Sequence, residues 1–124
     1  MTTKPVILVV DDDAPILTLM KNILREFGFE AMVASTGAAA LESARERTPD
    51  LVLLDKNMPG MSGSEVIQEI RAQARLAHIP ILILSGEPVE PRELAELGAN
   101  GAVQKPFDVP SLIDHIRAHV GVRL

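Results

Sequence analysis

The 124-residue sequence contains no cysteine, no tryptophan and no tyrosine, and it has only three phenylalanines. The lack of cysteine excludes a disulfide scaffold and a thiolate metal centre, and it is compatible with a reducing compartment. The shortage of aromatic residues excludes stacking platforms for single-stranded nucleic acid and aromatic cages for cations. The hydrophobic residues that remain, 47% of the chain, are enough to form the core of one domain, expected to span residues 1–124.

Positive charge and long apolar runs are also scarce. Twelve basic residues face seventeen acidic ones, and the net charge of −5 argues against direct binding of nucleic acid through its phosphates. The sequence has no run of 18 apolar residues, and its first residues lack the pattern of a signal peptide. We therefore expect a cytoplasmic protein that does not bind membranes.

Short apolar runs alternate with segments of helical periodicity along the whole chain. Strands are expected at Val6–Val10, Phe29–Ala34, Leu51–Leu54, Ile81–Leu84 and Ala102–Gln104. Helices are expected to begin at Asp13 or Ala14, at Ser35 or Thr36, and near Ser62, Pro91 and Pro110, and Ser62 with Glu65 has the spacing of a capping box. This alternation predicts an α/β fold, a doubly wound five-stranded parallel sheet with five helices. Right-handed crossovers leave few strand orders, among them the flavodoxin-like order 2-1-3-4-5.

Ligands of such sheets bind beyond the carboxyl ends of the strands, and polar residues gather there in this sequence. The expected strands one, three, four and five are followed or ended by Asp11–Asp13, Asp55, Ser85 and Lys105. Strands one and three would be neighbours about 4.8 Å apart, which brings Asp11 or Asp12 within several ångströms of Asp55. Two carboxylates about 5 Å apart repel by about 3 kcal/mol at an effective dielectric of about 20. The cluster therefore needs a proton, a divalent cation or a nearby lysine.

These residue types together suit phosphoryl chemistry. An open cluster of carboxylates is a typical Mg²⁺ site, and a lysine and a hydroxyl can contact phosphoryl oxygens. Asp55, which has no neighbouring histidine or cysteine, would be the nucleophile that forms an acyl phosphate. Each residue alone has a simpler explanation, since Asp13 can be a helix N-cap and Lys105-Pro106 a turn. The prediction depends on four strand ends that supply the groups of one site.

Four segments of the sequence also match a known family in order and spacing. They are Ile7–Asp13, Leu53–Gly63, Ile83–Gly86 and Gly98–Phe107. Over its whole length the sequence resembles the receiver domain of two-component response regulators. The resemblance implies that Asp55 accepts a phosphoryl group from a phosphohistidine of a sensor histidine kinase or a histidine phosphotransfer protein, and that the protein then changes its binding surface for a downstream effector. It implies a protein that catalyses only its own phosphotransfer and dephosphorylation, and it allows a phosphorylation-dependent homodimer.

The resemblance also assigns the site residues. It implies Mg²⁺ bound by Asp12, Asp55 and the backbone carbonyl of Asn57, with Asp11 reaching the ion directly or through water. It implies that Ser85 turns toward the phosphoryl oxygens, that Lys105 pairs with them, and that the Lys105–Pro106 peptide bond is cis. In relatives the positions of Asn57 and Glu87 modulate hydrolysis of the acyl phosphate, and this pair of residues predicts fast turnover.

Ala102 departs from the family pattern. Relatives carry tyrosine or phenylalanine at this position, and the ring moves inward when the phosphoryl group binds. Because alanine has no ring, we expect signalling through residues 86–90 and the fourth helix, over Pro91–Leu97. Four arginines, Arg45, Arg47, Arg71 and Arg75, are expected to solvate helix ends, since cations suit helix C-termini.

Other functions remain open at the level of the sequence. An aspartate-dependent small-molecule phosphohydrolase would usually carry a second acid where this chain has Asn57. A flavodoxin-type electron carrier would need a loop rich in glycine and hydroxyl groups after the first strand, where this chain has aspartates. A receiver that works without phosphorylation would not need Asp12, Asp55, Ser85 and Lys105. The chain could also be a receiver domain cut from a larger regulator or hybrid kinase.

Overall fold

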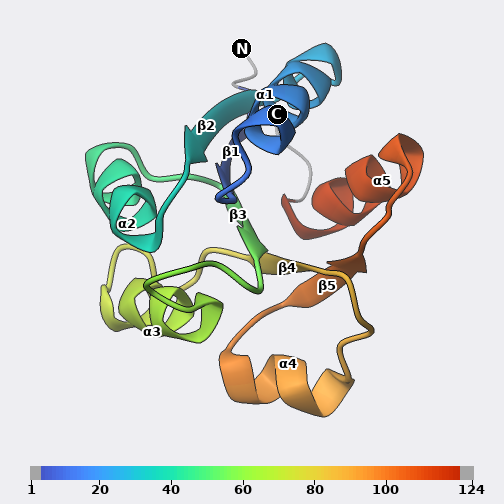
Figure 1. Ribbon diagram of the computed structural model, residues 1–124. Helices are drawn as coiled ribbons and strands as arrows, with labels where there is room; N and C mark the ends of the chain where they lie inside the picture. The colour runs from blue at the N-terminus through green and yellow to red at the C-terminus, as the bar shows by residue number, and fades with distance from the viewer. Residues whose placement is uncertain (1–3, 121–124) are drawn as a thin grey trace.

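Five strands and five helices alternate along the chain in the computed structural model, which describes residues 4–120 (Figure 1). The strands are β1 (Val6–Val10), β2 (Glu30–Ala34), β3 (Leu51–Asp55), β4 (Ile81–Ser85) and β5 (Gly101–Gln104). The helices are α1 (Ala14–Glu26), α2 (Gly37–Glu46), α3 (Gly63–Ala72), α4 (Pro91–Leu97) and α5 (Val109–Val120). The strands are parallel in the order β2-β1-β3-β4-β5, which confirms the predicted fold. Among the described residues, no helix is long and apolar enough to cross a bilayer.

Three of the helices begin at residues whose side chains cap the helix N-terminus. The side chain of Asp13 accepts a hydrogen bond from the backbone of Ile16 at 3.3 Å, and Thr36 caps α2 in the same way. Ser62 and Glu65 form the predicted capping box at α3. Such caps satisfy backbone N–H groups that have no partner within the helix, and each contributes about 1 kcal/mol.

The sheet separates two hydrophobic cores. Leu8 and Val10 of β1 belong to the core with α2 and α3, whereas Ile7 and Val9 belong to the core with α1 and α5. Figure 1 shows α1 and α5 on one face of the sheet, and α2, α3 and α4 on the other. Because successive side chains of a strand point to opposite faces, the position of a residue at a strand end decides which of these faces it meets.

Arg71 lies in the last turn of α3 and binds backbone carbonyls, including that of Gly98 at the end of α4, as predicted for a cation at a helix end. Its guanidinium donates hydrogen bonds to the carbonyls of Ala77, Ile79 and Gly98 and to Oδ1 of Asn100. Burial lowers the pKa of Arg71 below its usual value. Arg75 donates to the carbonyls of Ala44 and Arg45 in the last turn of α2, as predicted for a cation at a helix end. Both arginines supply donors to carbonyls that only the tertiary structure brings within their reach.

Candidate functional site

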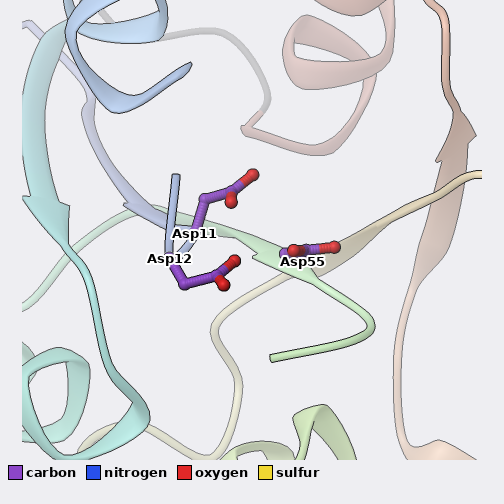
Figure 2. Close-up of side chains that lie close together, drawn as sticks. All are labelled: Asp11, Asp12 and Asp55. Atoms are coloured by element: carbon purple, nitrogen blue, oxygen red, sulfur yellow. The ribbon is translucent and has the colours of Figure 1, made fainter. Parts of the chain in front are cut away.

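Three carboxylates meet at the carboxyl edge of the sheet. Asp11 follows β1, Asp12 comes next, and Asp55 is the last residue of β3. Val10 pairs with Leu54 in the register of β1 and β3, which places Asp11 beside Asp55. One oxygen from each of the three aspartates lies within 4.8 Å of the others (Figure 2). The expected proximity of these carboxylates is therefore confirmed.

The three aspartates differ in their exposure to solvent. Asp11 is 1% exposed and Asp55 is 9% exposed, whereas Asp12 is open to solvent. Nζ of Lys105 lies 3.5 Å from an oxygen of Asp11 and 3.5 Å from an oxygen of Asp55. Asp12 opens the cluster to solvent, and a pocket lined by Asp11, Lys105 and Phe107 borders it on the side of the lysine.

The pKa of the Asp11 carboxyl is raised above its usual value. Burial is the main cause that raises the pKa of the Asp11 carboxyl, and the charge of Asp55 raises it further. The backbone N–H of Asp13, which donates to Asp11 at 3.0 Å, and the ammonium of Lys105 act in the opposite direction. Lys105 contacts two of the three clustered carboxylates, so the cluster carries more negative than positive charge and an additional cation would be favourable there.

Replacement of Asp11 by asparagine is expected to stabilise the protein at pH 7 without divalent cations, by about 1 kcal/mol. The folded-state pKa of Asp11 is raised, so its stabilising contribution is complete below the usual pKa of 3.8 and is lost as the pH rises through the folded-state value. Asparagine removes the buried charge and can still accept the Asp13 N–H. Urea unfolding in EDTA over a series of pH values below 7 measures the difference, which should decrease as the pH approaches the usual pKa of 3.8.

Asp13→Asn is the matched control, because it removes an exposed carboxylate but retains a good helix cap. We expect its free energy of unfolding to stay within about 0.5 kcal/mol of the unsubstituted value. A loss of stability in Asp11→Asn at pH 7 would contradict the electrostatic explanation.

Ser85 and Lys105 reach the same edge from neighbouring strands. Ser85 ends β4 and is 3% exposed, and its carbonyl accepts a hydrogen bond from the backbone of Lys105 at 2.7 Å. The hydroxyl oxygen of Ser85 accepts the backbone N–H of Glu87 at 3.1 Å, so the hydroxyl proton remains available as a donor. The Lys105–Pro106 peptide bond is cis, as the resemblance implied.

The remaining predicted positions flank this site. Asn57 and Glu87 are exposed in the loops that follow β3 and β4. Ala102 pairs with Ile83 in the register of β4 and β5, and it packs against the core that includes α2 and α3. The sheet face beneath α4 therefore carries a methyl group at the position where the family pattern has an aromatic ring.

Sequence reasoning missed the contact between Lys56 and Glu93. Nζ of Lys56, the residue after Asp55, lies 2.8 Å from a carboxylate oxygen of Glu93 in α4. The alternation of side chains along β3 could have predicted the face on which Lys56 lies, because Val52 and Leu54 face the core with α2 and α3. The partner residue could not be found in this way, because the position of α4 depends on the tertiary structure.

The strand order and the polar residues at the strand ends agree with the family comparison. A family model described as "Response regulator receiver domain" matches residues 7–117. The chain belongs to this family. As a receiver domain it is a phosphorylation-activated signalling switch of a two-component system.

Individual relatives agree with this assignment. The chain is 38% identical over 109 residues to "Chemotaxis protein CheY-3" of Vibrio cholerae serotype O1, an alignment that covers 86% of this chain and 84% of the relative. The crystal structure of the chemotaxis protein CheY4 of Vibrio cholerae matches with a TM-score of 0.89 and 31% identity, over 94% of this chain and 99% of that one.

A third similar structure bears on the metal. The receiver domain of the sensor histidine kinase PA1611 from Pseudomonas aeruginosa PAO1 matches with a TM-score of 0.87 and 28% identity. The match covers 97% of this chain and 100% of that one, and that protein has a magnesium ion coordinated in its active site cleft. Receiver domains bind Mg²⁺ in an acidic pocket, and this chain has a cluster of three aspartates at the corresponding edge of its fold. The family also implies histidine kinases as partners and downstream effectors as targets.

Proposed function

We propose that Asp55 is the phosphoryl acceptor and that the donor is a phosphohistidine of a sensor histidine kinase or a histidine phosphotransfer protein. The position of Asp55 carries this proposal: it ends β3 between two further aspartates and Lys105, and it is 9% exposed. A carboxylate oxygen of Asp55 attacks the phosphorus, and the bond from phosphorus to the imidazole nitrogen breaks. The electron pair stays on the imidazole, which takes up a proton, and Asp55 becomes an acyl phosphate.

The donor atoms of the cluster fit Mg²⁺, which we propose as the cofactor. Asp11, Asp12, Asp55 and the backbone carbonyl of Asn57 would hold it, and carboxylate and carbonyl oxygens are the ligands that this ion prefers. When bound, Mg²⁺ supplies positive charge that stabilises the phosphoryl oxygens in the transition state.

Lys105 and Ser85 complete the proposed site. Lys105 holds its ammonium 3.5 Å from the acceptor carboxylate, where it can pair with a phosphoryl oxygen. Ser85 can donate its hydroxyl proton to another phosphoryl oxygen, which requires a rotation of its side chain. The same groups would promote dephosphorylation of Asp55, so the protein would catalyse only reactions of its own acceptor.

The proposal also covers the extent of the domain, its effector, its oligomeric state and its location. We propose a receiver domain over residues 1–124, of which 1–3 and 121–124 lie outside the described residues. The effector would be a protein that recognises the surface changed by phosphorylation. A phosphorylation-dependent homodimer through α4, β5 and α5 is the alternative use of that surface. A cytoplasmic location fits a partner that carries the phosphohistidine of a two-component system.

Incubation with acetyl phosphate and Mg²⁺, followed by measurement of the intact mass, tests this function. We expect one phosphoryl group per chain, which is absent when EDTA removes the metal and which decays after the acetyl phosphate is removed. Repeated turnover of a generic phosphate ester would favour the phosphohydrolase alternative. An unchanged mass under conditions that phosphorylate a known receiver domain would contradict the proposal.

The residues that flank the site predict a short-lived acyl phosphate. Asn57 and Glu87 are polar and exposed beside the acceptor, where they can position a water molecule in line with the phosphorus. The double variant Asn57→Ala, Glu87→Ala is therefore expected to lengthen the phosphoryl lifetime several-fold, measured from the decay of the phosphorylated mass. A lifetime equal to that of the unsubstituted protein would refute this role, and Glu90→Ala, in the same loop as Glu87, is the control.

A further inference from the structure

Helix α4 is weakly attached to the rest of the domain. It has seven residues, Pro91–Leu97, and none of them is buried. Its apolar contacts lie at the end of the helix, where Leu97 and the following Ala99 pack against the core that includes α3. In Figure 1, α4 lies at the lower edge of the fold, away from α1 and α5. With little buried surface, its position is determined by a few polar contacts.

Two polar contacts hold α4 at its opposite ends. At the end of the helix, the guanidinium of Arg71 donates to the carbonyl of Gly98 at 3.1 and 3.0 Å. Near its start, Glu93 forms the 2.8 Å ion pair with Lys56. The first contact joins α4 to α3, whereas the second joins it to the residue that directly follows the proposed acceptor. Among the described ion pairs, the Lys56–Glu93 pair connects the start of α4 to the site, in addition to the loop 86–90 that leads from Ser85 to Pro91.

The geometry of β3 explains how one segment serves both the site and α4. Side chains of β3 alternate between the two faces of the sheet. Asp55 continues the series of Leu51 and Leu53, which face the core with α1 and α5. Lys56 continues the series of Val52 and Leu54, which face the core with α2 and α3. The backbone N–H of Lys56 donates to the carbonyl of Leu84 at 3.0 Å, so β4 holds this residue in place. Consecutive residues thus present the acceptor carboxylate on one face and an ammonium on the face of α4.

The same face lacks the usual aromatic switch. Ala102 lies on it beside Ile83, and its side chain has no rotatable ring that could report the state of Asp55. Besides the loop 86–90, a side-chain contact can then connect phosphorylation to α4. The Lys56–Glu93 pair is the described ion pair that joins the acceptor segment to this helix.

We propose that Lys56 couples the acceptor to α4 through its ion pair with Glu93, an inference that rests on the proposed phosphorylation of Asp55. Without the phosphoryl group, the pair holds the start of α4 against the loop after β3. The phosphoryl group adds negative charge at the neighbouring residue, and this charge attracts the ammonium of Lys56 across the end of the strand and weakens its attraction to Glu93. The start of α4 is then released, while Arg71 keeps the end of the helix in place.

The exposure of the pair limits the size of this effect. The side chains of Lys56 and Glu93 are 27% and 38% exposed, so solvent screens their attraction. Ion pairs of this kind contribute at most about 1 kcal/mol, which corresponds to a shift of about fivefold in an equilibrium. Coupling is reciprocal, so a variant without the pair should bind a phosphoryl analogue more tightly by the same factor.

Variants of Glu93 test the coupling without a change of charge at the site itself. Glu93→Gln is expected to bind beryllium fluoride, a phosphoryl analogue, about two- to fivefold more tightly in the presence of Mg²⁺. The amide hydrogens at the start of α4 should also exchange faster in this variant, to the level that beryllium fluoride produces in the unsubstituted protein. Glu96→Gln is the matched control, because it removes an exposed pair with Arg92 within the same helix.

Swapping the charges of Lys56 and Glu93 distinguishes coupling through the ion pair from a local effect of the substitution on α4. The double variant Lys56→Glu, Glu93→Lys restores an attractive pair, and it should bring the amide exchange of α4 back toward the unsubstituted level, whereas Lys56→Glu alone should not. Lys56→Arg should keep both the affinity and the exchange unchanged. If the protein binds beryllium fluoride but Glu93→Gln behaves like Glu96→Gln, the coupling is wrong and the proposed function stands. If the unsubstituted protein neither binds the analogue nor accepts a phosphoryl group, the proposed function itself is wrong.

Discussion

Replacement of Asp55 by asparagine is expected to abolish phosphoryl incorporation from acetyl phosphate. The carboxylate oxygen is the proposed nucleophile, and a neutral amide of the same shape cannot form an acyl phosphate. Asparagine fits the same space at the end of β3 and removes one charge from the aspartate cluster, so the fold should be retained. Intact mass after incubation with acetyl phosphate and Mg²⁺ measures the loss, and urea unfolding confirms that the variant is folded.

Asp13→Asn is the control for this experiment, because it changes an aspartate that caps α1 two residues after Asp11. We expect it to accept one phosphoryl group as the unsubstituted protein does. Full incorporation in Asp55→Asn would show that the acceptor is a different residue. Treatment with hydroxylamine, which cleaves acyl phosphates but not phosphate esters, would then distinguish a second aspartate from a hydroxyl group.

Replacement of Lys105 by methionine is expected to slow phosphorylation by about 100-fold or more. Methionine retains most of the aliphatic chain but removes the ammonium that lies 3.5 Å from both Asp11 and Asp55. A fixed charge that stabilises the transition state contributes about 100- to 1,000-fold to a rate. The rate follows from the increase in the phosphorylated mass with time at a saturating concentration of Mg²⁺.

The same variant should also be less stable at pH 7, because Asp11 loses the cation that compensates its buried charge. The double variant Asp11→Asn, Lys105→Met should recover stability but not the phosphorylation rate, which separates the structural role of the lysine from its role in the reaction. Lys21→Met, on α1, removes the same charge elsewhere and is expected to change neither quantity. A rate for Lys105→Met within twofold of the unsubstituted protein would refute the proposed role.

Much of the fold could be predicted from local patterns. Continuous apolar runs identified β1, β3 and β4 because each is buried on both faces of the sheet. The predicted bounds of each strand lie within one residue of those observed, because strong turn and cap signals flank each run. The strand order itself was one of few that right-handed crossovers allow, and the structure selected it.

The residues that make up the site could also be predicted from the sequence. Parallel strands end at the same edge of a sheet, so residues that follow several strands must lie near one another wherever the strands are neighbours. The sequence therefore predicts that Asp11, Asp12, Asp55, Ser85 and Lys105 belong to one site. The environments of these residues do not follow from the sequence. Asp11 and Asp12 are adjacent in sequence, yet Asp11 is buried beside β2, where its backbone N–H donates to Ala34, and Asp12 is exposed.

The amino-acid sequence by itself determined the alternation of strands and helices, the helix caps and the gathering of carboxylates, because these depend on periodicity and on the direction of the strands. Only the tertiary structure decided that the pKa of Asp11 is raised, that Arg71 binds the carbonyl of Gly98, and that Lys56 reaches Glu93. Each of these contacts joins segments that are far apart in the sequence, and the distance between them in space depends on how the helices pack against the sheet. Sequence periodicity gives the face of an element on which a side chain lies, but not the partner that packing brings to it.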